Sequence, residues 1–386
     1  MSEPSSAKVP YRTIVREWGR LGFVGFGGPP THIALLRRLC VDQRGWIDAR
    51  EFEDGIATVN LLPGPASTQL AIYCAWRLRG ALGGLLGGLC FITPGLVIIT
   101  ALAALFLEHH PPLWVLGAAA GSGAAVPAVA LHAASRLAAS SPLRSEARRS
   151  DLLRWSLYAL AGAVCAAFAG AFVVVALLAC GALEVVWRAQ GRRSGPARAA
   201  APLALHVAGV GGLGALAWVA LKVGALSYGG GFVIIPLMQH DVVSTYHWMS
   251  GAQFLNAVAL GQVTPGPVVL TIAVVGYAAA GIAGALLGTV LAFGPSFLFV
   301  LGGATHFERI RSSTTVRHFL AGAGPAVIGA IAGSAVALGL ALKHPWQVPV
   351  LVGALLWLLV VRRGVVSTVV LAGAIGVVLA LAGVVV

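Results

Sequence analysis

Charged side chains are scarce in this sequence. Only 10% of its 386 residues are Asp, Glu, Lys or Arg, whereas 58% are hydrophobic, and the mean hydropathy is +0.88. A soluble globular domain carries about 25% charged residues, so the composition excludes that class. Apolar runs near the ~20 residues needed to cross a bilayer recur along the whole chain. The sequence therefore predicts an all-α polytopic membrane protein.

Acidic residues are scarcer than basic ones: 13 Asp and Glu stand against 26 Lys and Arg, which gives a net charge of +13. Such an excess would suit nucleic-acid binding. Here, however, the arginines lie in short segments between apolar runs, where they set the orientation of the spans. We therefore expect no nucleic-acid partner. The segment Met1–Pro10 is short and polar, so we also expect no cleavable signal peptide.

Metal-binding and catalytic motifs are lacking. The five cysteines show no CxxC spacing and all lie in the first half of the chain, so we expect small apolar side chains rather than a metal site. The patterns HExxH and GxSxG do not occur. These absences argue against a membrane-embedded enzyme, and we expect neither a metal nor another cofactor.

Glycine, in contrast, is abundant, with 50 residues. Several of these glycines lie in a stretch of sequence that occurs twice in the chain. A shift of 202 positions, without a gap, places Gly22–Gly28 on Gly224–Gly230, Trp46 on Trp248, and Pro63–Pro65 on Pro265–Pro267. Each copy holds two apolar segments that glycine and proline interrupt. Paired broken segments in two halves of a membrane protein indicate a transport site, because unpaired backbone groups survive at membrane depth only where they line a cavity.

The duplication divides the chain into two transporter repeats. We expect a first repeat over residues 11–188, a basic cytoplasmic linker over 189–202, and a second repeat over 203–386. The second repeat is expected to open with an additional helix at Leu203–Leu221. In each repeat, two broken segments are followed by transmembrane helices.

Loop charge predicts the orientation of the repeats. If arginine-rich loops lie in the cytoplasm, Arg37–Arg50 lies inside, whereas its counterpart His240–Ala252 has no Lys or Arg and lies outside. The two copies are thus predicted to be inverted, with a cytoplasmic N-terminus. Phe52–Trp76 would then be a re-entrant hairpin, unless the charge rule fails at this one place.

The broken segments predict an anion site. Where a helix resumes after a break, its first N–H groups point into the gap with a partial positive charge, and four such tips would surround one small anion. In the first copy the predicted substrate-binding residues are Gly27, Gly28, Pro29, Thr31, Asn60, Pro63, Gly64, Pro65, Ser67, Thr68 and Gln69. In the second copy they are Lys222, Tyr228, Gly229, Gly230, Gln262, Thr264, Pro265, Gly266, Pro267 and Thr271. Alternatively, the breaks only kink helices for packing.

Few ionisable side chains lie within the apolar segments. Arg20 and Lys222 are equivalent under the shift, and each precedes a glycine-rich break. They either attract the anion electrostatically or extend to the membrane interface. Asp54 and Glu53 lie at the mouth of the first Pro-Gly-Pro segment, where they are candidates for the uptake of a coupled proton. The alternative is that both are solvated carboxylates at the start of a helix.

Several motifs run through both copies in a fixed order. They are Phe23–Pro29, Trp46–Phe52, Asn60–Pro65 with Gln69, and the echoes Ser227–Gly231 and Gln262–Pro267. In these motifs the chain resembles the chromate ion transporter family in its two-domain form. The resemblance implies export of chromate across the bacterial inner membrane, driven by the proton motive force and giving chromate resistance.

Two other activities stay open at this point. Sulfate is a tetrahedral dianion of nearly the same shape as chromate, so a sulfate or general oxyanion transporter is one alternative, and a passive anion channel is another. The expected partners are a small oxyanion, protons and the lipid bilayer. A homodimer stays open as well.

Overall fold

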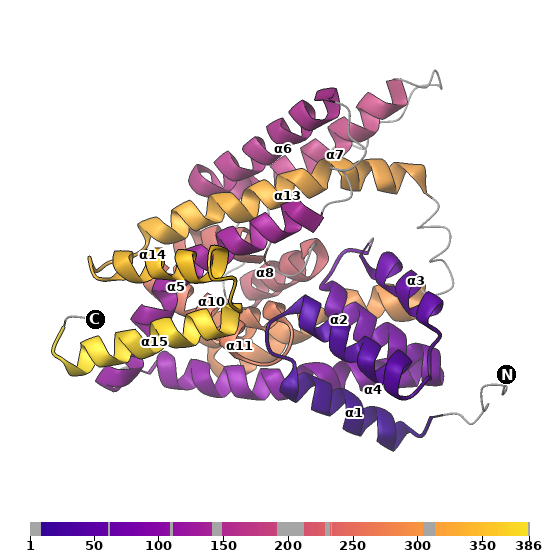
Figure 1. The fold of residues 1–386 in the computed structure, drawn as a ribbon, viewed down its shortest axis with the longest axis horizontal. Helices are drawn as coiled ribbons and strands as arrows, with labels where there is room; N and C mark the ends of the chain where they lie inside the picture. The colour runs from indigo at the N-terminus through magenta and orange to yellow at the C-terminus, as the bar shows by residue number, and fades with distance from the viewer. Residues whose placement is uncertain are drawn as a thin grey trace.

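The chain is helical throughout its described part. A computed structural model describes residues 9–60, 62–108, 111–140, 149–190, 212–227, 232, 234–303 and 313–384, and these ranges contain no β-strand (Figure 1). The helices of the first half are α1 (Tyr11–Val24), α2 (Pro29–Arg37), α3 (Ala49–Val59), α4 (Ala66–Phe106), α5 (Leu113–Ser140), α6 (Arg149–Phe168) and α7 (Val173–Gln190). Those of the second half are α8 (Leu213–Leu226), α9 (Ile234–Gln239), α10 (Gly251–Val263), α11 (Thr271–Phe297), α13 (Thr314–Leu340), α14 (Gln347–Leu359) and α15 (Val365–Leu381). Short π or 3-10 turns are η1 (Arg38–Gln43), η3 (Gly170–Phe172), η4 (His240–Thr245), η5 (Val268–Leu270) and η6 (Leu298–Gly302).

Among the residues that the structure describes, five helical segments are long and apolar enough to cross a membrane. They are Ala66–Phe106, Leu113–Ala139, Asp151–Phe168, Val268–Gly302 and Thr314–Leu340. Three other apolar helices, α8, α14 and α15, have 14, 13 and 17 residues, fewer than the ~20 of a straight crossing. The prediction of an all-α polytopic membrane protein is confirmed.

The two copies of the repeated stretch have the same local structure. Helix α8 begins and ends 202 positions after α1, and the π-turn η4 follows η1 with the same shift. The N–H groups of Trp46 and Trp248 each donate to the carbonyl oxygen six residues earlier, at 2.8 and 3.0 Å. Gly45 has φ +57°, and its counterpart His247 has φ +52°. The second copy thus keeps the positive φ at this turn, although it has histidine there instead of glycine, and side chains other than glycine rarely adopt a positive φ.

Each copy leads into a long helix with one sharp kink. Helix α4 leaves helical geometry at Arg79–Gly80, and α11 does so at Ala280–Gly281; the two glycines have φ +65° and +62°. The kink divides α4 into residues 66–78 and 81–106. The first part and α3 are each shorter than the ~20 residues that cross a bilayer. These lengths suit the predicted re-entrant hairpin, which stays a prediction.

The additional helix expected at Leu203–Leu221 overlaps α8. Its first part, residues 203–211, lies outside the described residues. The remainder belongs to α8, which is the counterpart of α1. In the described part of the chain, α8 is therefore the first helix of the second repeat, and no additional helix precedes it. The predicted inversion then rests on the charge of the loops alone.

Helices of each half pack against the other half. Helices α6 and α7 lie along α13, whereas α14 and α15 lie along α5 (Figure 1). Small residues allow close approach: a Cβ on Gly329 would lie 1.8 Å from the oxygen of Ala159, and one on Gly376 would lie 2.0 Å from the oxygen of Gly117. Because α5 and α13 also contact each other, the two halves form one interlocked helix bundle.

Candidate anion-binding site

The breaks of the two copies meet inside the protein. The N–H of Gly64 donates to the carbonyl oxygen of Ser227 at 3.0 Å, and the N–H of Gly266 donates to that of Gly25 at 2.9 Å. Gly64 and Gly266 are equivalent under the 202 shift, as are Gly25 and Ser227. Each Pro-Gly-Pro tip therefore binds the first break of the other copy. This exchange pairs backbone groups that the breaks leave without partners.

Glycine is required at both tips, for partly different reasons. Gly64 has φ +126° and Gly266 has φ +100°, a region that residues with a side chain rarely adopt. A Cβ on Gly64 would also lie 2.5 Å from Nε2 of Gln69 and 2.8 Å from Oγ of Ser296. At Gly266 the nearest atom would be Cδ1 of Leu270, at 3.2 Å. The tip of the first copy is thus the more crowded and the more polar of the two.

The start of α4 carries a group of buried polar side chains. Ser67, Thr68 and Gln69 are at most 1% exposed. Gln69 Nε2 donates to the oxygen of Pro63 at 2.7 Å, whereas Gln69 Oε1 and Thr68 Oγ1 have no partner among the described residues. The N–H groups of Ala66 and Ser67 open the helix and have no acceptor within it. This end of α4 combines backbone donors, a partial positive charge and unsatisfied polar atoms, as an anion site requires.

The corresponding segment of the second copy uses its polar groups locally. The hydroxyl of Thr271 donates to the oxygen of Val268 at 2.8 Å, and that of Thr264 donates to the oxygen of Leu260 at 2.8 Å. Gln262 is buried, and its Nε2 has no partner in the part of the chain that the structure describes. The two copies therefore contribute unequally, and the unsatisfied polar groups concentrate at the start of α4.

The start of α2 offers fewer donors than its position after a break suggests. Pro29–Pro30 have no N–H, and the N–H groups of Thr31 and His32 donate to the oxygen of Gly28 at 3.1 and 3.2 Å. Donors to an anion here would come from Gly27 and Gly28, which have φ +96° and +78°. Tyr228, Gly229 and Gly230, the predicted counterparts at the second break, lie outside the described residues.

Sequence reasoning missed His32, which lies at this junction. His32 is buried, and its Nε2 lies 2.9 Å from the oxygen of Gly25. Its ring meets that of Phe91 edge-on at 5.1 Å, and Nδ1 has no partner among the described residues. The signal was available: an ionisable side chain three residues after Pro29, in an apolar segment, is a functional candidate by default.

Two serines at the junction were also missed. Ser227 and Ser296 are fully buried, and the hydroxyl of each has no partner within the described ranges. Ser296 Oγ faces the tip at Gly64, as the 2.8 Å approach above shows. The residue that corresponds to Ser296 after the one-residue slip of the kink is Gly95, and a Cβ on it would lie 2.3 Å from the oxygen of Pro265. Within the described residues, this pair of positions therefore places a hydroxyl of the opposite copy beside the first tip and none beside the second.

The remaining predicted residues are distributed around the site. Asn60 is exposed at the end of α3, although its equivalent Gln262 is buried. The side chain of Arg20 is 74% exposed and lies 3.8 Å from Glu17. Glu53 forms an exposed ion pair with Arg37 at 2.5 Å, and such pairs stabilise a protein by at most about 1 kcal/mol.

Lys222 has a charged partner that sequence reasoning missed. Its side chain is 13% exposed and forms an ion pair with Asp241, at the start of η4. Asp241 is the only Asp or Glu between positions 185 and 307, and this isolation was a usable signal. Burial and the carboxylate of Asp241 raise the pKa of Tyr246 in the loop that follows η4, so its hydroxyl stays protonated.

Comparison with known proteins identifies the family. A sequence profile described as "Chromate transporter" matches residues 12–185 and 214–379. The chain belongs to the chromate transporter family. The two matches to the chromate transporter profile begin 202 positions apart, which is the shift that relates the two copies. The resemblance inferred from the motifs is thereby confirmed.

Relatives in the chromate transporter family are similar over most of their length. The chain is 33% identical to the "Chromate transport protein" of Cupriavidus metallidurans over 337 residues, which cover 85% of this chain and 82% of the relative. It is 32% identical to a "Probable chromate transport protein" of Synechococcus elongatus, with 83% and 82% covered. It is 26% identical to an uncharacterized transporter, MJ0718, of Methanocaldococcus jannaschii, with 86% and 85% covered. No solved structure matches the chain.

Proposed function

We propose that this protein is a secondary active transporter that exports chromate across the bacterial inner membrane. The proton motive force would drive export, and export would give resistance to chromate. The observation that carries the proposal is the crossing of two glycine–proline tips over buried, unsatisfied polar groups, in a chain whose relatives are named chromate transport proteins. Such a protein catalyses no covalent reaction.

Chromate would bind at the start of α4. Its four oxygens accept hydrogen bonds, and the available donors are the N–H groups of Ala66 and Ser67 and the hydroxyls of Thr68 and Ser296. The helix N-terminus adds roughly half a positive charge. A site built from dipoles holds a dianion without a buried side-chain charge, which leaves the empty site stable in an apolar surrounding.

In this scheme, the arrangement of the tips would correspond to a closed state. Ser67, Thr68, Gln69 and both tips are buried, so no side of the membrane would reach the site. Alternating access would separate one crossing at a time. The bond from Gly64 to Ser227 would break in one open state, and the bond from Gly266 to Gly25 would break in the other.

Proton coupling requires an ionisable group that changes its charge during the cycle. Asp54 and Glu53 stay the candidates from the sequence, and the Lys222–Asp241 pair adds a further one. Protonation of Asp241 would remove the partner of Lys222, whose free charge would then attract the anion. If Asp54 is the coupled group instead, Asp54→Asn removes the pH dependence of transport and leaves anion binding nearly intact.

The deciding experiment is flux into everted membrane vesicles. We expect the vesicles to accumulate radiolabelled chromate when a proton gradient is present, and to lose this uptake when an uncoupler is added. Vesicles without the protein are the control. Equal uptake of labelled sulfate would indicate a general oxyanion transporter. Chromate uptake that is the same with and without the proton gradient would indicate a passive channel. No uptake of either anion by folded protein would refute the proposal.

A further inference from the structure

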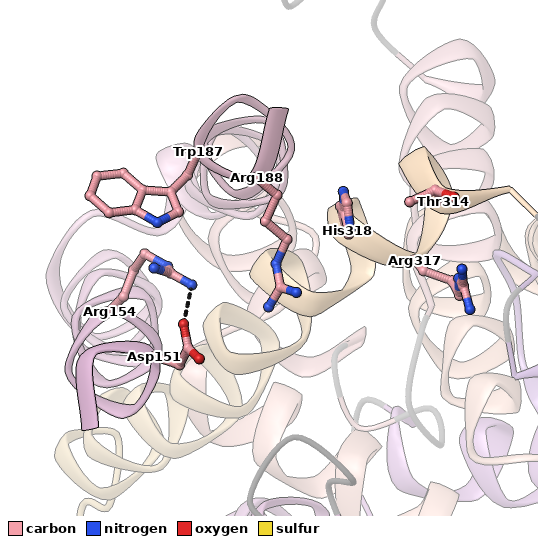
Figure 2. A pocket seen from close by; sticks show the side chains of 7 residues that line it. All are labelled: Asp151, Arg154, Trp187, Arg188, Thr314, Arg317 and His318. Carbon is pink, nitrogen blue, oxygen red and sulfur yellow. Dashed lines mark hydrogen bonds and ion pairs between the residues drawn. The ribbon is translucent and has the colours of Figure 1, made fainter. Parts of the chain in front are cut away.

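A second polar region lies away from the crossed tips, between the ends of α6, α7 and α13. It is a cavity of about 620 Å³, and Figure 2 shows the side chains that line it: Asp151, Arg154, Trp187, Arg188, Thr314, Arg317 and His318. The start of α6, the end of α7 and the start of α13 contribute these residues. None of them takes part in the proposed transport site.

A buried carboxylate fixes two of the arginines. Glu184 is fully buried and accepts from Nε and Nη2 of Arg154 at 2.7 and 3.1 Å, and from Nε of Arg188 at 2.7 Å. Arg154 also donates to Asp151 at 2.7 Å. Arg188 contacts Glu184 through Nε, which leaves its two terminal amino groups free of that carboxylate. Figure 2 shows the guanidinium pointing from α7 toward α13. This guanidinium is therefore held in place with donors that face the cavity.

The cavity carries an excess of positive charge. Arg317, on the first turns of α13, is exposed and forms no ion pair in the part of the chain that the structure describes. Among the described residues, the three arginines thus stand against two carboxylates, Asp151 and the buried Glu184. Thr314 opens α13, whose first N–H groups add a partial positive charge on the same side. An anion with several oxygens would satisfy these donors.

Helix α6, which contributes to the cavity, has an exposed apolar face that would contact lipid. Leu153, Leu157 and Leu160 recur at helical spacing on α6 and are 70%, 63% and 60% exposed. Trp187 on α7 is also largely exposed, and the guanidinium of Arg154 lies 5.2 Å from the centre of its ring. Tryptophan at the end of an apolar helix is typical of the membrane–water interface. The cavity therefore opens at the depth where lipid headgroups lie.

We propose that this cavity binds the phosphate group of an anionic membrane lipid, with its acyl chains along α6 and α7. Arg188 would donate to the phosphate oxygens, since a guanidinium fits phosphate with two parallel hydrogen bonds. The side chain of Arg317, which points away from Arg188 in Figure 2, would turn toward the same phosphate. Basic pockets between transmembrane helices bind anionic headgroups in this way. A zwitterionic headgroup would bring its own cation to a site with three arginines, so it binds less well.

The test measures lipid binding to the full-length protein purified in detergent. The midpoint of thermal unfolding is followed while phosphatidylglycerol or phosphatidylcholine is added, and retained lipid is counted by native mass spectrometry. We expect phosphatidylglycerol to bind at least tenfold more tightly than phosphatidylcholine. Arg188→Gln and Arg317→Gln should each weaken its binding about tenfold. Arg363→Gln removes an exposed arginine from the turn between α14 and α15, and this matched control should bind as the unchanged protein does.

Three results would overturn the proposal. The first is equal binding of the two lipids. The second is an equal loss in Arg317→Gln and Arg363→Gln, which would mean that surface charge in general attracts the lipid. The third is a thermal shift with inorganic phosphate as large as that with phosphatidylglycerol and absent in Arg317→Gln, which would make free phosphate the ligand. Because Arg317 pairs with neither Glu184 nor Asp151, its variant is expected to fold even if that of Arg188 does not.

Discussion

Substitution of Gly64 by alanine tests whether the first tip is shaped around Gln69 and Ser296. Its equivalent Gly266 is a matched control, because both glycines have positive φ and both donate their N–H to the opposite copy. Alanine in a left-handed conformation costs about 1–2 kcal/mol, and this cost applies at both positions. Any difference between the variants therefore comes from what the new methyl group contacts.

The contacts differ strongly. At Gly64 the added carbon would lie 2.5 Å from Nε2 of Gln69, so the amide has to move away and lose its bond to the oxygen of Pro63. A buried polar group left without its partner costs about 1–3 kcal/mol. At Gly266 the carbon would lie 3.2 Å from the end of the flexible Leu270 side chain, which moves at little cost. We therefore expect Gly64→Ala to destabilise the protein by about 1–3 kcal/mol more than Gly266→Ala.

Thermal unfolding of both variants in the same detergent measures this difference, and chromate uptake per amount of protein measures its effect on transport. We expect the lower unfolding midpoint and the larger loss of uptake in Gly64→Ala. Equal losses of stability and uptake in the two variants would refute the reasoning. Backbone strain would then account for the whole effect, and the polar contacts at Gly64 would contribute nothing to it.

Three further predictions concern transport and the orientation of the two copies. Ser296→Ala should raise the KM for chromate severalfold, whereas Ser334→Ala, which removes a buried hydroxyl already bonded to a helix carbonyl, should not; equal KM values would exclude Ser296 from the site. Asp241→Asn should flatten the pH profile of uptake, and an unchanged profile would mean that the pair with Lys222 is only structural. Cysteines placed at Gly45 and His247 should react with an impermeant reagent from opposite sides of the membrane; reaction from one side would contradict the inverted arrangement.

Much of the local structure could be predicted because it depends on neighbouring residues. Glycine and proline mark both breaks, and the shift of 202 locates the correspondences up to the kinks, where the shift becomes 201. The predicted hairpin segment Phe52–Trp76 ends just before the kink at Arg79–Gly80, where a glycine with φ +65° lets one helix follow another without a loop. Proline chemistry also explains why the start of α2 has few donors.

Other features depend on contacts between distant residues, and single-sequence patterns do not encode these. The pairing of Lys222 with Asp241 needs η4 to fold back onto α8. The asymmetry of the tips depends on Ser296 and Gly95, which lie far along the chain from the tips that they contact. Periodicity shows that a helix has an apolar face, but it does not name the helix that covers that face.

The packing of α5 against α15 has a consequence for how the chain is made. Between Ser140, the last residue of α5, and Val365, the first residue of α15, the chain runs for 225 positions. At a synthesis rate of about 5–20 residues per second, α15 emerges roughly 10–45 s after α5. During that time, the face of α5 that contains Gly117 and Gly121 lacks the helix that covers it in the folded protein. Membrane proteases and insertion factors would therefore encounter an incomplete helix bundle until α15 has been inserted.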